Sequence, residues 1–382
     1  MSIEREVSAA NEAHRRAFPV SRLLSSGMAY EDVLALHASV ADGKDWHQVA
    51  EELGSENGLR AEDAIAHGRT MTARGWHLYA SACYRTGQAV LPDSKPDKAR
   101  LYRKAIEHFG SAGELTDPPF EHRLVAYGTR QVRTWLIRPA VPRPPTVVVL
   151  GGFDGWREEH EFASRPLLER GIAVVLMEAP GQGETRIFGR NFMHEGYEHA
   201  FSAVLDMVRA DSRLADSVGI WGNSFGGCLA ARAALADKRF GAVCVNGGSV
   251  QPAEVLERFP RLTSRVQDLF GLDDPDRART ALESFRLDAG QLASLTAPLL
   301  VLHGAPDRIF LIENARSMHA WAGSADKTFR EWADGEHCIY NHAEERNLLV
   351  ADWFTDRLNP EHESAEPGRS NRRSTNAEAR GI

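Results

Sequence analysis

One ten-residue stretch, from Val218 to Gly227, constrains the fold of this chain more than any other. It reads Val-Gly-Ile-Trp-Gly-Asn-Ser-Phe-Gly-Gly, which predicts a short buried strand, a tight turn and the start of a helix. The turn fits the pattern G-x-S-x-G, in which a serine on a strained backbone needs small residues two positions before and after it. The helix that follows directs the partial positive charge of its N-terminus toward the serine. We therefore expect the hydroxyl of Ser224 to stand exposed at the end of a sheet.

Length and composition describe a large globular protein. The chain has 382 residues, of which 43% are hydrophobic and 26% charged, enough for one large domain and a smaller one. A net charge of −8, with both signs mixed along the chain, argues against nucleic acid or an anionic membrane as partner. The widely spaced cysteines contain no C-x-x-C pair and suggest neither a disulfide framework nor a zinc site. Without an apolar leader or an 18-residue apolar run, we expect a cytoplasmic location.

Residues 1–118 are predicted to form a helical N-terminal domain. We expect one long helix from Ala61 to Leu91, with Trp76 and Tyr79 on its apolar stripe, and another from Lys98 to Phe109. The aromatic side chains exceed what isolated helices would expose to water, so they must be buried against something. We expect this region to cover a pocket as a lid, to form part of a homodimer interface, or both. The plainer alternative is that these aromatic side chains serve packing alone.

Residues 119–358 are predicted to form the core domain, because strands alternate with helices along this part of the chain. A hairpin is expected from Glu121 to Arg138, and later strands are apolar on both faces, as buried parallel strands are. The alternation predicts an α/β fold with a mostly parallel sheet and helices on both faces. Residues 251–295 interrupt it and are expected to form a helical cap over the carboxyl edge of the sheet. The polar residues 359–382 are predicted to be a disordered tail.

The core domain is predicted to contain further strands and helices. Strands are expected at 146–150, 172–177, 242–245, 298–302 and 327–332, and helices at 159–170 and 343–357.

The serine needs two partners, because a hydroxyl is a poor nucleophile unless a base accepts its proton and an acid orients that base. Asp307 and His337 each follow a predicted strand, at the sheet edge where catalytic side chains gather in open α/β sheets. The order serine, acid, histidine along the chain predicts a catalytic triad of Ser224, Asp307 and His337. Asp307 could instead be an ordinary loop acid. Asp334 and Glu336 are nearer to the histidine in sequence but are expected to be solvated.

An oxyanion hole requires two N–H groups directed at the developing charge. One is expected to be the backbone N–H of Phe225, the residue after the serine. The other is expected from the glycine-rich loop at 151–155, where we favour the N–H of Phe153 because glycines permit close approach of the backbone. The plainer alternative is a turn that merely contains many glycines.

These motifs together resemble the α/β-hydrolases of the 2,6-dihydroxypseudooxynicotine hydrolase type, which are related to FrsA-like esterases and to fungal polyketide chain-shortening hydrolases. The resemblance covers nearly all of the chain except the tail, and it implies the α/β-hydrolase fold. The sequence departs from the family at Glu178-Ala179, where the family usually has Asp-Gly, so this loop is expected to line the pocket differently. The matching pieces are the helical N-terminal segment, the loop at 151–155, Ala179-Pro-Gly-Gln-Gly-Glu184, the turn at 222–227, Gly304-Ala-Pro-Asp307, and Gly335-Glu-His-Cys338 with Asn341.

The resemblance implies hydrolysis of a carbon–carbon bond next to a ketone, or of an ester or acyl bond, in a partly apolar small molecule. Some members carry an extra acid in the cap, and Glu254 and Glu257 are placed for that role, although both could be cap-surface acids. The same acyl-enzyme could serve an acyltransferase or cyclase, and the fold could also be a ligand-binding module without turnover. No metal or nucleotide cofactor is expected, because the pattern Gly181-x-Gly183 lacks a third glycine and a P-loop lysine.

Overall fold

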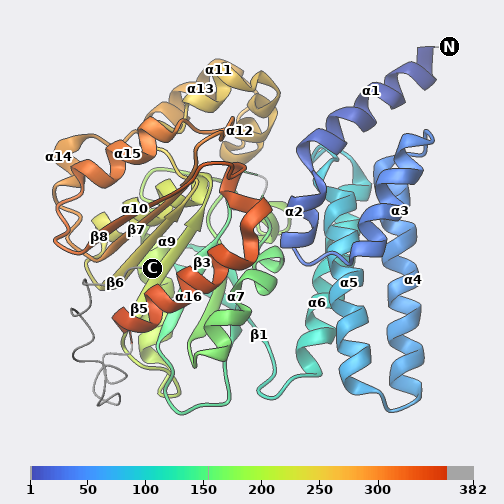
Figure 1. Ribbon diagram of the computed structural model, residues 1–382, viewed down its shortest axis with the longest axis horizontal. Helices are drawn as coiled ribbons and strands as arrows, with labels where there is room; N and C mark the ends of the chain where they lie inside the picture. Colours follow the sequence, from blue (N-terminus) through green and yellow to red (C-terminus); the bar gives the residue numbers. More distant parts are fainter. Residues whose placement is uncertain (1, 154, 359–382) are drawn as a thin grey trace, which may run out of the picture.

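The structure is a computed structural model that describes residues 2–153 and 155–358. Figure 1 shows a group of long helices standing beside a sheet that is covered by helices on both faces. The predicted tail, residues 359–382, lies outside the described residues. The division of the chain into a helical domain and a core domain stays a prediction. The N-terminal helices are α1 (Ser2–Ala17), α2 (Val20–Ser25), α3 (Tyr30–Ala41), α4 (Trp46–Ala66), α5 (Thr70–Ala89) and α6 (Pro96–Glu114).

The prediction of a single helix from Ala61 to Leu91 was wrong, because two helices, α4 and α5, occupy this range and lie side by side (Figure 1). The break lies at Gly68, whose φ of +68° is in the left-handed region that favours glycine and commonly ends helices. The N–H of Arg69 then donates to the carbonyl of Ala64 at 2.8 Å, which satisfies one of the last carbonyls of α4. The second predicted helix is present as α6.

Eight strands form one sheet in the order β1-β2-β4-β3-β5-β6-β7-β8. The predicted hairpin is confirmed, because β1 pairs antiparallel with β2, and β2 pairs antiparallel with β4. Every later pair in the sheet is parallel, as the apolar strands predicted. The strands are β1 (Glu121–Tyr127), β2 (Arg130–Ile137), β3 (Thr146–Leu150), β4 (Ala173–Glu178), β5 (Val218–Asn223), β6 (Phe240–Asn246), β7 (Leu299–Gly304) and β8 (Lys327–Trp332).

Two hydrophobic layers lie on opposite faces of this sheet. Along β3, Val148 and Leu150 belong to one layer and Val147 and Val149 to the other, because successive side chains of a strand point to opposite faces. Helices α9 and α10 contribute to the first layer, and α7 and α16 to the second. The helices are α7 (His160–Glu169), α8 (Gly183–Ile187), α9 (Glu198–Ala210), α10 (Phe225–Ala236), α15 (Ile312–Trp321) and α16 (Ala343–Leu358), with short 3₁₀ turns η1 (Arg157–Glu159) and η3 (His337–His342).

Residues 251–295 form short helices between β6 and β7. Glu254 accepts a hydrogen bond from the N–H of Leu311, in the loop that follows β7. The carbonyl of Leu269 accepts from the N–H of Met193, in the segment after β4. The insertion therefore contacts loops that follow the carboxyl ends of two strands. Its elements are α11 (Glu254–Arg258), η2 (Pro260–Leu262), α12 (Thr263–Phe270), α13 (Pro275–Glu283) and α14 (Ala289–Leu292).

The N-terminal helices contact both the core and the insertion. Ser21 in α2 donates to Glu336, which immediately precedes η3, at 2.5 Å. Arg265 in α12 donates to the carbonyl of Ala89 at the end of α5, at 2.6 Å. Phe109 in α6 belongs to the same hydrophobic layer as α7 and α16. In the described ranges of the chain, none of the helices is long and apolar enough to span a bilayer.

Candidate active site

Ser224 lies on a sharp turn between β5 and α10. Its φ of 58° and ψ of −129° place a non-glycine residue in a sparsely populated region, which stores backbone strain at this position. A Cβ atom on Gly222 would lie 2.0 Å from the carbonyl oxygen of Gly226, so the backbone approach leaves no room for a side chain. The N–H of Ser224 donates to the carbonyl of Asn246 at 2.8 Å and ties the turn to β6. The small residues of the G-x-S-x-G pattern are therefore a steric requirement.

The structure brings the three predicted triad residues together. The Nε2 atom of His337 lies 2.9 Å from Oγ of Ser224, and its Nδ1 atom lies 2.8 Å from Oδ2 of Asp307. The other carboxylate oxygen of Asp307 accepts from the N–H groups of Ile309 at 2.7 Å and Phe310 at 3.3 Å. With Nδ1–H donated to the carboxylate, Nε2 is the nitrogen that can accept the serine proton.

A second histidine, His303 in β7, also lies beside Asp307. It was not identified from the sequence as part of the site. Its Nε2 atom lies 3.5 Å from Oδ2 of Asp307 and 3.2 Å from the carbonyl oxygen of Phe310, and the side chain is fully buried. Burial would raise the pKa of Asp307, but the contacts with His337 and His303 hold it below its ordinary value. The one signal in the sequence was a polar residue inside an otherwise apolar strand.

The segment that carries His337 is also strained. Cys338 and Ile339 have φ values of 53° and 59°, and a β-branched residue in the left-handed region is an outlier. Two hydrogen bonds hold the carbonyl of Cys338, from Asn246 at 3.1 Å and from Arg346 at 2.6 Å.

Burial would lower the pKa of His337, but the negative charge of Asp307 outweighs the effect of burial and holds the pKa of His337 above its ordinary value.

Asn341, which belongs to the motif at 335–341 that resembles the family, holds the loop before His337. Its Oδ1 atom accepts from the N–H of Glu336 at 2.8 Å, and its Nδ2 atom donates to the carbonyl of Asp334 at 2.8 Å. The two acids nearer to the histidine in sequence are engaged elsewhere, Asp334 with His342 at 2.9 Å and Glu336 with Ser21. The imidazole of the triad therefore contacts Asp307 and neither of these acids through its hydrogen bonds.

The glycine-rich loop after β3 lies directly against the serine. A Cβ atom on Gly152 would be 2.8 Å from Cβ of Ser224, 2.9 Å from its Oγ and 3.1 Å from the backbone nitrogen of Phe225. The ring of Phe153 stacks on the ring of Phe225, with centroids 4.4 Å apart and planes at 6°. Asp154 lies outside the described residues. The structure thus places both predicted oxyanion residues beside the nucleophile, and their role as donors stays a prediction.

The two candidate cap acids differ in their surroundings. Glu254 is half-buried and accepts from Oγ of Ser249 at 2.6 Å and from the N–H of Leu311 at 3.3 Å. Burial raises the pKa of Glu254, although the hydrogen bond from Ser249 opposes this. Glu257, one turn further along α11, is exposed to solvent. Of the two, Glu254 contacts the loop that also carries Asp307.

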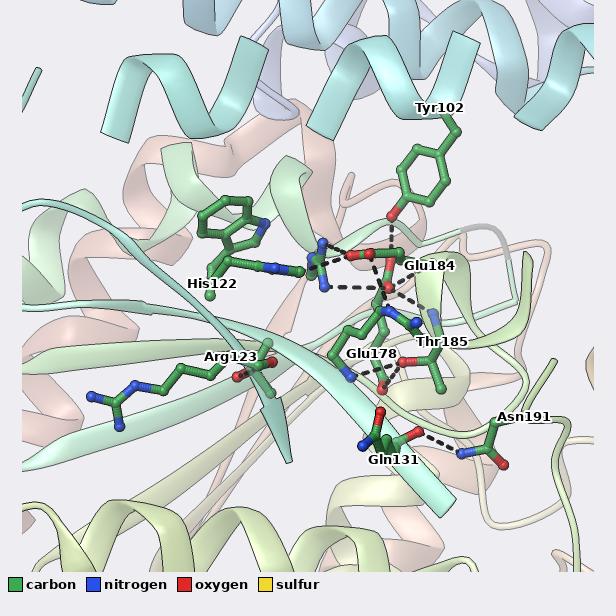
Figure 2. Close-up of polar contacts among 12 residues, drawn as sticks. Tyr102, His122, Arg123, Gln131, Glu178, Glu184, Thr185 and Asn191 are labelled. Atoms are coloured by element: carbon green, nitrogen blue, oxygen red, sulfur yellow. Dashed lines mark hydrogen bonds and ion pairs between the residues drawn. The ribbon is translucent and has the colours of Figure 1, made fainter. Parts of the chain in front are cut away.

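Glu178, where the sequence departs from the family, belongs to a buried charged cluster between α6 and the core (Figure 2). Its carboxylate accepts from the N–H groups of Glu184 at 2.6 Å and Thr185 at 3.3 Å, and from the hydroxyl of Tyr102, which reaches down from α6. Arg157 lies 3.8 Å from the same carboxylate and also binds Glu184. The side chain of Glu178 is thus directed into this cluster, where it anchors the segment that follows β4.

The sequence of this chain is similar to those of known hydrolases. Residues 147–373 match the model of the alpha/beta hydrolase family. The 2,6-dihydropseudooxynicotine hydrolase of Paenarthrobacter nicotinovorans is 26% identical over 341 residues, covering 88% of this chain and 91% of that protein. The hydrolase LUC6 of a Fusarium species is 29% identical over 347 residues, covering 77% and 82%.

Solved structures agree with the sequence matches. The crystal structure of the 2,6-dihydroxy-pseudo-oxynicotine hydrolase gives a TM-score of 0.81 at 23% identity, over 88% of this chain and 95% of that one. AbyA5 gives a TM-score of 0.68 at 20% identity, over 84% and 87%. The predicted fold and resemblance are therefore confirmed, and this chain is an enzyme of the alpha/beta hydrolase family.

Proposed function

We propose that this enzyme is a serine hydrolase that cleaves a carbon–carbon bond next to a ketone, or an ester bond, in a small molecule. The observation that carries the proposal is the position of His337, 2.9 Å from the hydroxyl of Ser224 and 2.8 Å from the carboxylate of Asp307. Ser224 attacks the substrate carbonyl while Nε2 of His337 takes the hydroxyl proton. Asp307 keeps the imidazole in the required tautomer and stabilises the imidazolium. His337 then returns the proton to the leaving group, which leaves an acyl group on Ser224. Water, activated by His337, attacks this acyl-enzyme and releases the carboxylic acid.

The negative oxygen of the tetrahedral intermediate needs donors that are already in place. We assign this role to the backbone N–H groups of Phe225, at the N-terminus of α10, and of Phe153, in the loop packed against the serine. The close approach of Gly152 to Ser224 supports the second assignment, because it holds the loop within reach of the reacting carbonyl. Loss of one such donor costs about 10²- to 10³-fold in kcat in comparable sites.

Cleavage of a carbon–carbon bond makes a further demand, since a proton must be delivered to carbon. We propose that Glu254, rather than Glu257, is the acid that assists His337 in delivering this proton. Burial raises the pKa of Glu254, so its carboxyl can hold a proton closer to neutral pH than an exposed acid would. Its hydrogen bond to the N–H of Leu311 keeps it on the loop that carries Asp307.

The names of the relatives support a proposal for the substrate class. The relative that covers 88% of this chain is named 2,6-dihydropseudooxynicotine hydrolase. We propose an aryl ketone with ortho hydroxyl groups as the substrate. We propose that the N-terminal helices act as a lid, because α2 contacts the residue that precedes η3. We also propose a homodimer that uses exposed apolar side chains of α4 and α5, among them Leu59, Ile65 and Met71.

The test is a comparison of two substrate panels with purified wild-type protein and Ser224→Ala. One panel holds aryl ketones with ortho hydroxyl groups, and the other holds short acyl esters. Turnover of either panel by the wild type, lost in Ser224→Ala, supports the proposal and identifies the bond that is cleaved. Turnover that survives in Ser224→Ala within about tenfold contradicts the role of the serine. Product analysis with an added alcohol or amine distinguishes hydrolysis from acyl transfer.

A further inference from the structure

Gln182, in the segment that follows β4, joins two loops beside the nucleophile. Its Nε2 atom donates to the carbonyl of Gly151 at 2.7 Å and to that of Gly152 at 3.0 Å. Its Oε1 atom accepts from the N–H of Ala179 at 2.9 Å, and only 3% of the residue is exposed. Both amide hydrogens of this buried side chain are therefore used on the glycine-rich loop.

The hydrogen bond to Gly152 bears on the proposed oxyanion hole because of peptide geometry. The carbonyl of Gly152 and the N–H of Phe153 belong to one planar peptide unit, in which the two groups point in opposite directions when the bond is trans. A donor that holds the carbonyl from one side therefore fixes the direction of the N–H on the other side. A hydrogen bond to the carbonyl also polarises the unit and strengthens its N–H as a donor.

We propose that Gln182 is a positioning residue that directs the N–H of Phe153 toward the oxyanion of the reaction catalysed by Ser224. The inference rests on the proposed function, since it assigns a task to a residue that does not touch the reacting atoms. It also gives a physical reason for the Pro-Gly-Gln-Gly-Glu string, in which the glutamine holds the loop at 151–155 and its neighbours hold the glutamine.

The neighbours of Gln182 keep its backbone in one position. Gly181 and Gly183 have φ values of +84° and +37°, and a Cβ atom on Gly183 would lie 1.6 Å from the carboxylate of Glu178. The N–H of Gly181 donates to the carbonyl of Asn191 at 2.8 Å. Figure 2 shows the carboxylate of Glu178 accepting a hydrogen bond from the N–H of Thr185, three residues after Gln182. The glutamine is thus presented to the glycine-rich loop from a rigid base.

The test uses Gln182→Met, which keeps the length of the side chain and removes its hydrogen bonds. The matched control is Asn191→Leu. Asn191 is a buried amide on the same segment, and its Nδ2 donates to the carbonyl of Gln131 at 2.8 Å (Figure 2). The same Nδ2 donates to the hydroxyl of Tyr127 at 2.8 Å, so its bonds do not involve the glycine-rich loop. Both variants lose two donated hydrogen bonds, so their melting temperatures should fall by similar amounts.

The first readout is inactivation by a fluorophosphonate, whose phosphoryl oxygen occupies the oxyanion hole. The second is the affinity for an alkyl trifluoromethyl ketone, which forms a hemiketal oxyanion with the serine. In Gln182→Met we expect kinact to fall about 10- to 100-fold with KI within about threefold, and the Kd of the ketone to rise by a similar factor. In Asn191→Leu all three should stay within about threefold of the wild type.

A third readout separates positioning from a loss of packing. Gln182→Glu loses its donors when the introduced carboxyl is ionised and regains one when it is protonated. The ratio of its kinact to that of the wild type should therefore rise at least threefold as the pH falls from 8 to 5. Because both proteins carry His337, the effect of its titration on kinact cancels in this ratio.

Three outcomes would overturn the inference. They are a kinact within about threefold of the wild type in Gln182→Met, equal losses in Gln182→Met and Asn191→Leu, or a ratio for Gln182→Glu that does not change with pH. Failure of the proposed function looks different, because the wild type itself would then not react with the fluorophosphonate. If Gln182→Met does not fold, Gln182→Glu provides both the rate and the pH readout.

Discussion

A single methyl group added at Gly152 should disable the site without disturbing the fold. The Cβ atom of Gly152→Ala would lie 2.8 Å from Cβ of Ser224 and 2.9 Å from its Oγ. Ordinary contacts between carbon atoms are about 3.5 to 4.0 Å, so the loop or the serine must move by roughly 0.7 to 1.2 Å. A misplacement of about 1 Å at reacting groups costs on the order of 10²-fold in rate. We therefore expect kcat/KM to fall about 100-fold.

The assay is kcat/KM on the best substrate of the two panels, together with the rate of fluorophosphonate labelling and the melting temperature. The matched control is Gly75→Ala in α5, where a Cβ atom would meet nothing within 4 Å. Because alanine is favoured over glycine inside a helix by about 0.5 to 1 kcal/mol, this control should be slightly stabilised and fully active. A Gly152→Ala variant with wild-type kcat/KM and wild-type labelling would refute the geometry on which the oxyanion assignment rests.

Three further predictions address the base, the cap acid and the helical region. Asp307→Asn should lower the rate on the order of 10⁴-fold. Because the neutral imidazole of His337 is the active base and the carboxylate raises its pKa, the rising limb of the pH profile of kcat/KM should move to lower pH; an unmoved limb would contradict the electrostatic role of Asp307. Glu254→Gln should slow ketone cleavage about 10²-fold and leave ester hydrolysis within about threefold, while Glu257→Gln changes neither; equal effects of the two substitutions on ketone cleavage would remove Glu254 from the mechanism. A chain starting at Glu121 should aggregate or lose substrate selection, as judged by light scattering and KM; a monomeric product with unchanged kcat and KM would show that the N-terminal helices are not a lid.

The parts of the site that could be predicted from the sequence are those that depend on neighbours along the chain. The turn at Ser224 follows from two glycines and a flanking strand and helix, and the structure shows why these residues must be small. Asp307 and His337 could be proposed because each follows a strand, and parallel strands bring their carboxyl ends to one edge of the sheet. The apolar runs predicted these strands because a strand covered on both faces cannot alternate polar and apolar residues.

The parts that could not be predicted depend on long-range contacts or on a single backbone angle. The break between α4 and α5 rests on the left-handed conformation of Gly68, and helical sequences also contain glycines that do not break the helix. His303 and Gln182 act through residues that the fold brings near, Asp307 and the loop at 151–155, and no local pattern reveals such a pairing. Glu254 and Glu257 looked equivalent because burial on a short helix is set by the surrounding loops.

Mass spectrometry of the fluorophosphonate adduct tests the central claim most directly. We expect one adduct per chain on the wild-type protein, on the peptide that contains Ser224, and no adduct on Ser224→Ala. The same variant should keep the wild-type circular dichroism spectrum, because a single half-buried hydroxyl contributes little to packing. It should lose on the order of 10³-fold or more in kcat. An adduct on another residue, or a Ser224→Ala protein that retains activity within about tenfold of the wild type, would contradict the assignment of Ser224 as the nucleophile.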